Sequence, residues 1–199
     1  MAMTPDQPAA RQPDHPVDPQ FPARWSPRSF TGRELAETEV MALLEAARWA
    51  PSASNQQPWR LVWARRGEAE FAVMRDTLTG NNPVWAGRAG ALVVVASKDT
   101  VPTREGAEVA NRTAGFDTGA AWMSLALQAR AMGLFAHAMG GFDRDGLAAA
   151  VALPRGHTIH CVVAVGEQGP ADALPEDLRA RETPSARKPV AEIAMHGRF

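Results

Sequence analysis

Ten consecutive residues in the first third of the chain carry several neutral hydrogen-bonding side chains and no ionisable one. The segment reads Ala50-Pro-Ser-Ala-Ser-Asn-Gln-Gln-Pro-Trp59, with two serines, one asparagine and two glutamines between its prolines. Small-molecule sites fix their ligands with a few convergent polar groups. Neutral donors and acceptors at this density therefore suit a flat, polar ligand that is held through hydrogen bonds.

A basic segment upstream, Arg24-Trp-Ser-Pro-Arg28, offers a complementary chemistry. In an extended conformation Arg24, Ser26 and Arg28 point to the same side, because side chains alternate with a period of two. Guanidinium groups match phosphate through paired, charge-assisted N–H···O bonds. The triplet alone also fits a solvated basic turn. Together with the neutral loop it indicates a phosphate-bearing flat ligand, and we expect flavin mononucleotide (FMN).

A third polar site candidate is the segment Met139-Gly-Gly-Phe142, which follows an expected strand. Two adjacent glycines allow a ligand ring to approach the backbone, because no Cβ stands in the way. The same residues also fit a plain turn between a strand and a helix, and this segment alone does not decide between the two.

The elements that position these residues follow from the pattern of apolar side chains. Val40, Leu43 and Ala47 recur at helical spacing over 35–49, and Pro51 ends that helix because the residue before a proline is pushed out of the α region. The rest of the chain predicts a turn at 80–83, strands at 60–64, 91–96, 134–138 and 160–165, and helices at 68–78, 117–132 and 143–152. We therefore expect an α+β fold, in which helices flank one mixed or antiparallel sheet.

Composition limits the class of protein. The chain has 199 residues, a formal net charge of −1 and one cysteine. One domain of ordinary size is expected, without the basic excess that nucleic acids or anionic membranes require. No apolar run approaches the roughly 20 residues of a membrane-spanning helix, and no secretion signal opens the chain. A lone cysteine fits a reducing compartment, so a cytoplasmic protein is expected.

The two ends of the chain differ from the body between them. Residues 1–22 contain six prolines and few large apolar residues, so we predict a mobile tail, or else a strap across a partner subunit, followed by one domain over 23–199. Residues 171–199 have no apolar stripe of their own. This end is expected to wrap over another surface, such as a second subunit.

Five segments, taken in order, resemble the FMN-dependent nitroreductase family, and the resemblance extends from about residue 23 to 199. The segment around the neutral loop is the most specific of them. The five segments are Arg24-Trp-Ser-Pro-Arg-Ser-Phe30, Ala46-Ala-Arg-Trp-Ala-Pro-Ser-Ala-Ser-Asn-Gln-Gln-Pro-Trp59, Asn82-Pro-Val-Trp85, Gly133-Leu-Phe-Ala-His-Ala-Met-Gly-Gly-Phe142 and Arg187-Lys-Pro-Val-Ala-Glu-Ile193.

The resemblance implies a nitroreductase-like, intertwined homodimer with an FMN at each end of its interface and a C-terminal arm that extends over the partner. It also implies which residues contact the cofactor. Arg24, Ser26, Arg28 and Arg187 would hold the phosphate and ribityl chain, Pro51, Ser52, Ala53 and Asn55 would line the isoalloxazine ring, Asn82 would lie near its pyrimidine side, and Met139, Gly140 and Gly141 would present backbone toward N5.

The chain departs from the family pattern in three places. Trp25 stands where the family often has a basic residue or histidine, so it is expected to pack on the flavin or on the partner. Ser185 stands where some members have a lysine near the flavin. The segment between the strand at 91–97 and the helix at 117 is short, which suggests an open or differently covered substrate pocket.

The resemblance implies an oxidoreductase that passes a hydride from NADPH or NADH through FMN to a small acceptor by a ping-pong mechanism. Nitroaromatics, quinones and activated carbonyl or alkene compounds are the expected acceptors. No catalytic side chain is assigned, because the cofactor carries the chemistry. No metal site is expected, and Cys161 is expected to be an inert core thiol. Oxygen-linked or flavin-consuming chemistry and a non-catalytic FMN-binding protein remain the alternatives.

Overall fold

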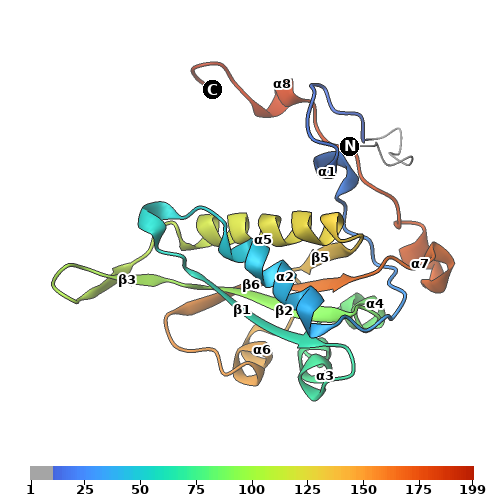
Figure 1. The fold of residues 1–199 in the computed structure, drawn as a ribbon, viewed down its shortest axis with the longest axis horizontal. Coiled ribbons are helices and arrows are strands. Elements are labelled where there is room, and N and C mark those ends of the chain that lie inside the picture. The colour runs from blue at the N-terminus through green and yellow to red at the C-terminus, as the bar shows by residue number, and fades with distance from the viewer. Residues whose placement is uncertain (1–10) are drawn as a thin grey trace.

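The core of the fold is an antiparallel sheet of four strands, seen in a computed structural model that describes residues 11–199 (Figure 1). The strands are β1 (Trp59–Arg65), β2 (Ala91–Lys98), β5 (Phe135–Met139) and β6 (His157–Gly166), in the spatial order β1-β2-β6-β5. The first seven residues of β2 are all buried. This confirms the strand predicted at 91–96, and its continuous apolar run is explained because β2 lies inside the sheet and is covered on both faces.

Helices cover both faces of the sheet, so the body has three layers (Figure 1). On one face lie α2 (Glu37–Arg48) and α5 (Ala114–Ala131), whose apolar residues pack with Trp59 and Val93. On the other face lie α3 (Ala69–Asp76) and α6 (Arg144–Ala150). The α+β arrangement that the sequence predicts is therefore confirmed.

Local signals in the sequence set where most elements begin and end. Gly133 follows α5 with a φ of 77°, a left-handed conformation that glycine adopts at little cost. The Asp143 side chain caps α6, since its carboxylate accepts a hydrogen bond from the Gly146 amide at 3.2 Å. The turn expected at 80–83 is shorter than predicted, because α4 (Asn82–Ala86) begins inside it with Pro83 in its first turn. Proline is tolerated there, since its missing N–H would have no helical partner.

The segment between β2 and α5 contains a small hairpin that the sequence pattern does not predict. It is formed by β3 (Thr100–Pro102) and β4 (Glu108–Ala110), which pair with each other and project from one end of the body (Figure 1). No helix among the described residues is long and apolar enough to cross a membrane.

The N-terminal segment, residues 11–23, lies beside the last part of the C-terminal arm, residues 171–199, away from the sheet (Figure 1). The first part of the arm packs on the body instead, since Leu174 and Leu178 are buried in its core. The N-terminal segment includes α1 (Gln20–Ala23), which packs against α5, and the C-terminal arm includes η3 (Ala171–Ala173), α7 (Glu176–Arg179) and α8 (Val190–Ile193). The Val190 amide donates a hydrogen bond to Asp14 Oδ2 at 2.8 Å, so the two ends touch where Figure 1 draws them together. Residues 1–10 of the expected tail lie outside the described residues.

Candidate functional site

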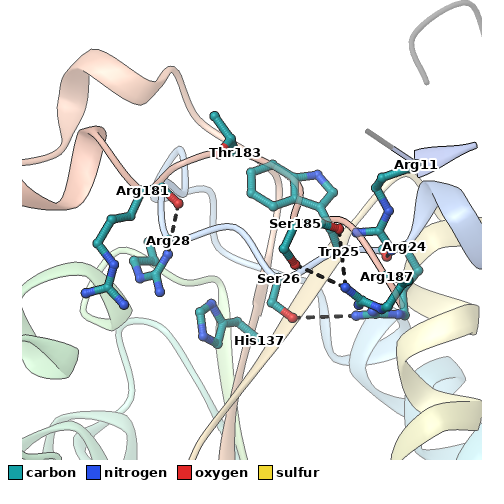
Figure 2. A pocket seen from close by; sticks show the side chains of 10 residues that line it. All are labelled: Arg11, Arg24, Trp25, Ser26, Arg28, His137, Arg181, Thr183, Ser185 and Arg187. Atoms are coloured by element: carbon teal, nitrogen blue, oxygen red, sulfur yellow. Dashed lines mark hydrogen bonds between the residues drawn. The ribbon is translucent and has the colours of Figure 1, made fainter. Parts of the chain in front are cut away.

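A basic cavity of about 300 Å³ lies between the N-terminal segment, β5 and the C-terminal arm (Figure 2). It brings together all four residues for which the resemblance implies phosphate or ribityl contacts, although Arg187 is far from the others in sequence. The lining residues are Arg11, Arg24, Trp25, Ser26, Arg28, His137, Arg181, Thr183, Ser185 and Arg187.

The cavity is lined by five arginines, and one carboxylate of the described residues balances their charge only in part. Burial lowers the pKa of Arg24, and the charge of Arg187 lowers it further. Among residues 11–199, the only carboxylate within ion-pair distance of the lining arginines is Glu182, at 4.0 Å from Arg28. Like charges gathered without counter-charges are unfavourable unless an anion lies between them. The cavity is therefore suited to a phosphate group.

A buried carboxylate holds the basic segment in place. Glu182, whose side chain is 1% exposed, accepts hydrogen bonds from the backbone amides of Arg28 and Ser29, each at 2.8 Å. The Ser29 hydroxyl donates to the Pro170 carbonyl at 2.6 Å. The segment that carries Ser26 and Arg28 is thus fixed to the C-terminal arm by charge-assisted hydrogen bonds.

Trp25 forms one wall of the cavity. Its ring meets Phe135 edge to face, with the centroids 6.1 Å apart and the planes at 75°. The Arg130 guanidinium lies 4.1 Å from the Phe135 ring centroid. Where the family often has a basic residue, this chain therefore uses an aromatic that packs on β5.

Ser185 also lines the cavity, and its hydroxyl accepts a hydrogen bond from Arg187 Nη1 at 3.1 Å. Ser185, which stands where some family members have a lysine, therefore orients the Arg187 side chain.

His137 connects the basic cavity with α4. Its Nδ1–H donates to the Pro27 carbonyl at 2.9 Å, a direction that follows because a carbonyl only accepts. Its ring packs on Trp85 of α4 with the centroids 4.6 Å apart. Burial lowers the pKa of His137, the hydrogen bond to Pro27 opposes this shift, and the charge of Arg28 adds to it. At neutral pH this side chain is therefore an uncharged imidazole.

Asn82, the first residue of α4, meets the double glycine. Its Nδ2 donates to the Gly141 carbonyl at 3.0 Å. A Cβ at Gly141 would lie 2.9 Å from that same Nδ2, whereas a Cβ at Gly140 would have no heavy atom within 4 Å. The Met139 side chain is buried in the core, so only its backbone could face a ligand. Gly140 thus borders open space in which a ring could approach the backbone.

The neutral loop adopts an unusual backbone at the surface. Ser54, Asn55 and Gln57 have φ values of 50°, 54° and 47°. Each such conformation in a residue other than glycine costs about 1–3 kcal/mol and tends to occur at functional sites. Two contacts hold the loop: the Ser52 hydroxyl accepts from the Gln57 amide at 3.0 Å, and Asp117 Oδ2 accepts from the Ala53 amide at 3.1 Å.

The neutral loop and the basic cavity do not meet within one chain. The loop binds Asp117 in the first turn of α5, whereas Trp25 packs on Phe135, beside Arg130 in the last turn. Asp117 and Arg130 are 130 − 117 = 13 residues apart, or roughly 20 Å at 1.5 Å per residue. Figure 1 likewise draws the loop that follows α2 and the segment that follows α1 at opposite ends of the body. Pro51, Ser52, Ala53 and Asn55 therefore lie apart from the other predicted site residues.

Sequence reasoning did not identify five residues in or behind the cavity: Arg11, His137, Arg181, Glu182 and Thr183. His137 lies inside a segment that resembles the family, two residues before Met139, so its place in that segment could have identified it as a site residue. The other four lie in irregular segments where no periodicity indicates which way a side chain points.

His160 and Cys161 lie on β6, outside the residues that line the basic cavity. Among residues 11–199, no group of three or more His, Cys, Asp or Glu side chains could hold a metal ion. His160 Nε2 lies 2.9 Å from the Ser97 hydroxyl. Burial raises the pKa of the Cys161 thiol to about 11, which leaves it protonated and a poor nucleophile at neutral pH.

Comparison with known proteins agrees with this geometry. The sequence model of the Nitroreductase family matches residues 22–81 and 67–167. A Streptomyces coelicolor relative named "Putative NADH dehydrogenase/NAD(P)H nitroreductase" is 32% identical over 168 residues, which cover 76% of this chain and 84% of the relative.

Solved structures show the same fold. One, described as "the oxidoreductase containing FMN", has a TM-score of 0.94 and 42% identity, and the similarity covers 99% of this chain and 98% of that chain. Another, from Desulfovibrio desulfuricans and described as a "putative nitroreductase in complex with fmn", has a TM-score of 0.71 and 24% identity over 92% of this chain and 99% of that chain. The present chain therefore belongs to the nitroreductase family, a class of FMN-dependent oxidoreductases.

Proposed function

We propose that this protein takes a hydride from NADPH or NADH and passes electrons through bound FMN to a small acceptor in a ping-pong cycle. Nitroaromatics, quinones and activated carbonyl or alkene compounds are the proposed acceptors. The observation that carries the proposal is the basic cavity, where Arg24, Ser26, Arg28 and Arg187 converge. The names of the S. coelicolor relative and of the 42% identical structure support it. The proposed compartment is the cytoplasm.

The residues present fit the two ends of FMN. The guanidinium-rich cavity suits a phosphate dianion, and the open space at Gly140 suits a flat ring beside the backbone. His137 and α4 join the two regions, since the ring that lines the cavity also packs on Trp85. When bound there, FMN would supply the hydride-transfer and electron-transfer chemistry, and the residues around it would bind and orient it.

The side chains of this chain then have binding and orienting roles. Arg24, Arg28 and Arg187 neutralise the phosphate, and Ser26 adds a hydroxyl. Trp25 closes the cavity against Phe135. His137 lines the cavity, and its Nδ1–H is already donated to the Pro27 carbonyl, so its role is to hold this wall in place.

A second copy of the chain would complete the site. The neutral loop is roughly 20 Å along α5 from the basic cavity, so a homodimer in which each subunit lends its loop to the partner's cavity would unite them. The arm supports this arrangement, because Ile193, Met195 and Phe199 are exposed large apolar residues near its end. Apolar side chains gathered in one exposed segment are common where a partner docks. Pro51, Ser52, Ala53 and Asn55 would then line the ring of the partner's FMN.

The test is the visible spectrum of the purified protein, recorded without oxygen before and after NADPH and, separately, NADH. The proposal predicts a yellow protein whose flavin absorbance is bleached by one of the nucleotides and restored by an acceptor. A colourless protein that does not bind added FMN would contradict it. A flavin that neither nucleotide reduces would favour the binding protein, and a reduced flavin that only oxygen restores would favour oxygen-linked chemistry.

A further inference from the structure

Arg11 is an arginine of the N-terminal segment whose side chain enters the basic cavity (Figure 2). It lies outside residues 22–167, the part of the chain that the family model matches. The residue is only 8% exposed, and its Nη2 donates to the Arg24 carbonyl at 3.0 Å. Its Nη1 is also buried, yet it has no hydrogen-bond partner among residues 11–199.

This environment is unfavourable for a guanidinium without a ligand. Buried donors in folded proteins nearly always have an acceptor, and an unpaired one carries a desolvation penalty. Burial lowers the pKa of Arg11, and the charges of Arg187 and Arg24 lower it further. An anion between the three arginines would remove the repulsion and supply the missing acceptor.

The segment that carries Arg11 is attached to the arm that carries Arg187. Asp14 Oδ2 accepts a hydrogen bond from the Val190 amide at 2.8 Å. Beside this contact, residues of the two segments and Met123 of α5 line a second cavity of about 820 Å³, whose walls include Val17, Phe21 and Ile193. One anion bound between Arg11 and Arg187 would therefore contact both ends of the chain at once.

We infer that Arg11 is a further ligand for a phosphomonoester in the basic cavity, and that phosphate binding fastens the N-terminal segment to the C-terminal arm. The inference rests on the proposed function for its first source of phosphate, the FMN cofactor. The 2′-phosphate of NADPH has the same chemistry and is the second source.

The experiment compares FMN with riboflavin, which lacks the phosphate, by fluorescence titration of flavin-free protein. Arg11→Gln is expected to raise the Kd for FMN about tenfold, because one charge-assisted hydrogen bond is lost. It should leave the Kd for riboflavin unchanged. Arg11→Lys should recover part of the affinity. Arg104→Gln, at an exposed position in the hairpin segment, is the matched control and should bind like the wild type.

The outcomes separate this inference from the proposed function. Wild-type protein that does not bind FMN would contradict the proposed function. Wild-type binding that Arg11→Gln leaves unchanged, or an equal loss for FMN and riboflavin, would overturn the role as an FMN phosphate ligand. If only the KM for NADPH rises in Arg11→Gln, and not that for NADH, the donor is the source of the phosphate.

Hydrogen exchange of residues 11–23 provides a readout that does not depend on flavin. Inorganic phosphate, compared with chloride at equal ionic strength, should slow exchange in the wild type but not in Arg11→Gln. Equal exchange in both proteins, with and without phosphate, would contradict the fastening of the two ends.

Discussion

Glu182 provides the strongest prediction about how the chain holds its anion site. The buried carboxylate accepts from two backbone amides, those of Arg28 and Ser29. In Glu182→Ala both amides lose their acceptor, and each buried unsatisfied donor costs about 1–3 kcal/mol. The free energy of unfolding should therefore fall by about 2–6 kcal/mol, a large part of the typical 5–15 kcal/mol of a domain.

Glu182→Gln keeps one acceptor oxygen but loses the charge. Its free energy of unfolding should therefore lie between that of the wild type and that of Glu182→Ala. The assay is urea unfolding at a fixed chain concentration, because the proposed homodimer would make stability depend on concentration. FMN affinity should fall in the same order, although Glu182 does not line the cavity, because the segment of Ser26 and Arg28 loses its support. Glu105→Ala, at an exposed position, is the control. If the free energies of unfolding of the Glu182 variants lie within about 0.5 kcal/mol of the wild type, as for a neutral surface substitution, the two amide hydrogen bonds do not hold this segment.

Three further predictions concern single groups. Without flavin, Gly140→Ala should unfold like the wild type, but it should bind FMN more weakly. Gly141→Ala should also lose thermal stability, since its Cβ would lie 2.9 Å from Asn82 Nδ2. Identical behaviour of the two variants would contradict this. The pKa of His137 is lowered in the folded state, so the unfolded state binds its proton first as pH falls below about 6.5. The flavin-free wild type should therefore lose more stability on acidification than His137→Gln does. Parallel pH profiles of the two proteins would disprove this. With a pKa of about 11, Cys161 should react with an aromatic disulfide at pH 8 only after unfolding; fast labelling of the folded protein would count against it.

The fold was largely predictable because its main elements bury regular apolar patterns. The apolar residues of α2 recur with a 3.6-residue period. The continuous apolar run of β2 is long enough for a strand buried on both faces. The hairpin of β3 and β4 escaped prediction because each strand is only three residues long and neither contains a buried residue. Strands that bury so little leave no pattern in the sequence.

The candidate site was predictable only in part. The alternation of Arg24, Ser26 and Arg28 indicated a shared direction, and all three line the cavity. Glu182 and Arg11 could not be found in this way, because charged residues in irregular segments acquire their roles from tertiary contacts. The separation of the neutral loop from the cavity was equally hidden, since it depends on the length of α5 and not on the loop.

A mixed dimer tests whether the cavity of one subunit and the neutral loop of the other form one FMN site. One chain carries Arg24→Gln with Arg28→Gln, and the other carries Asn55→Val, which places a β-branched residue at a φ of 54°. Light scattering verifies that every variant is dimeric. Each altered homodimer should bind FMN weakly, while the isolated mixed dimer should regain one site of wild-type affinity from its intact cavity and intact loop. A mixed dimer that binds FMN no better than the two homodimers would contradict the account.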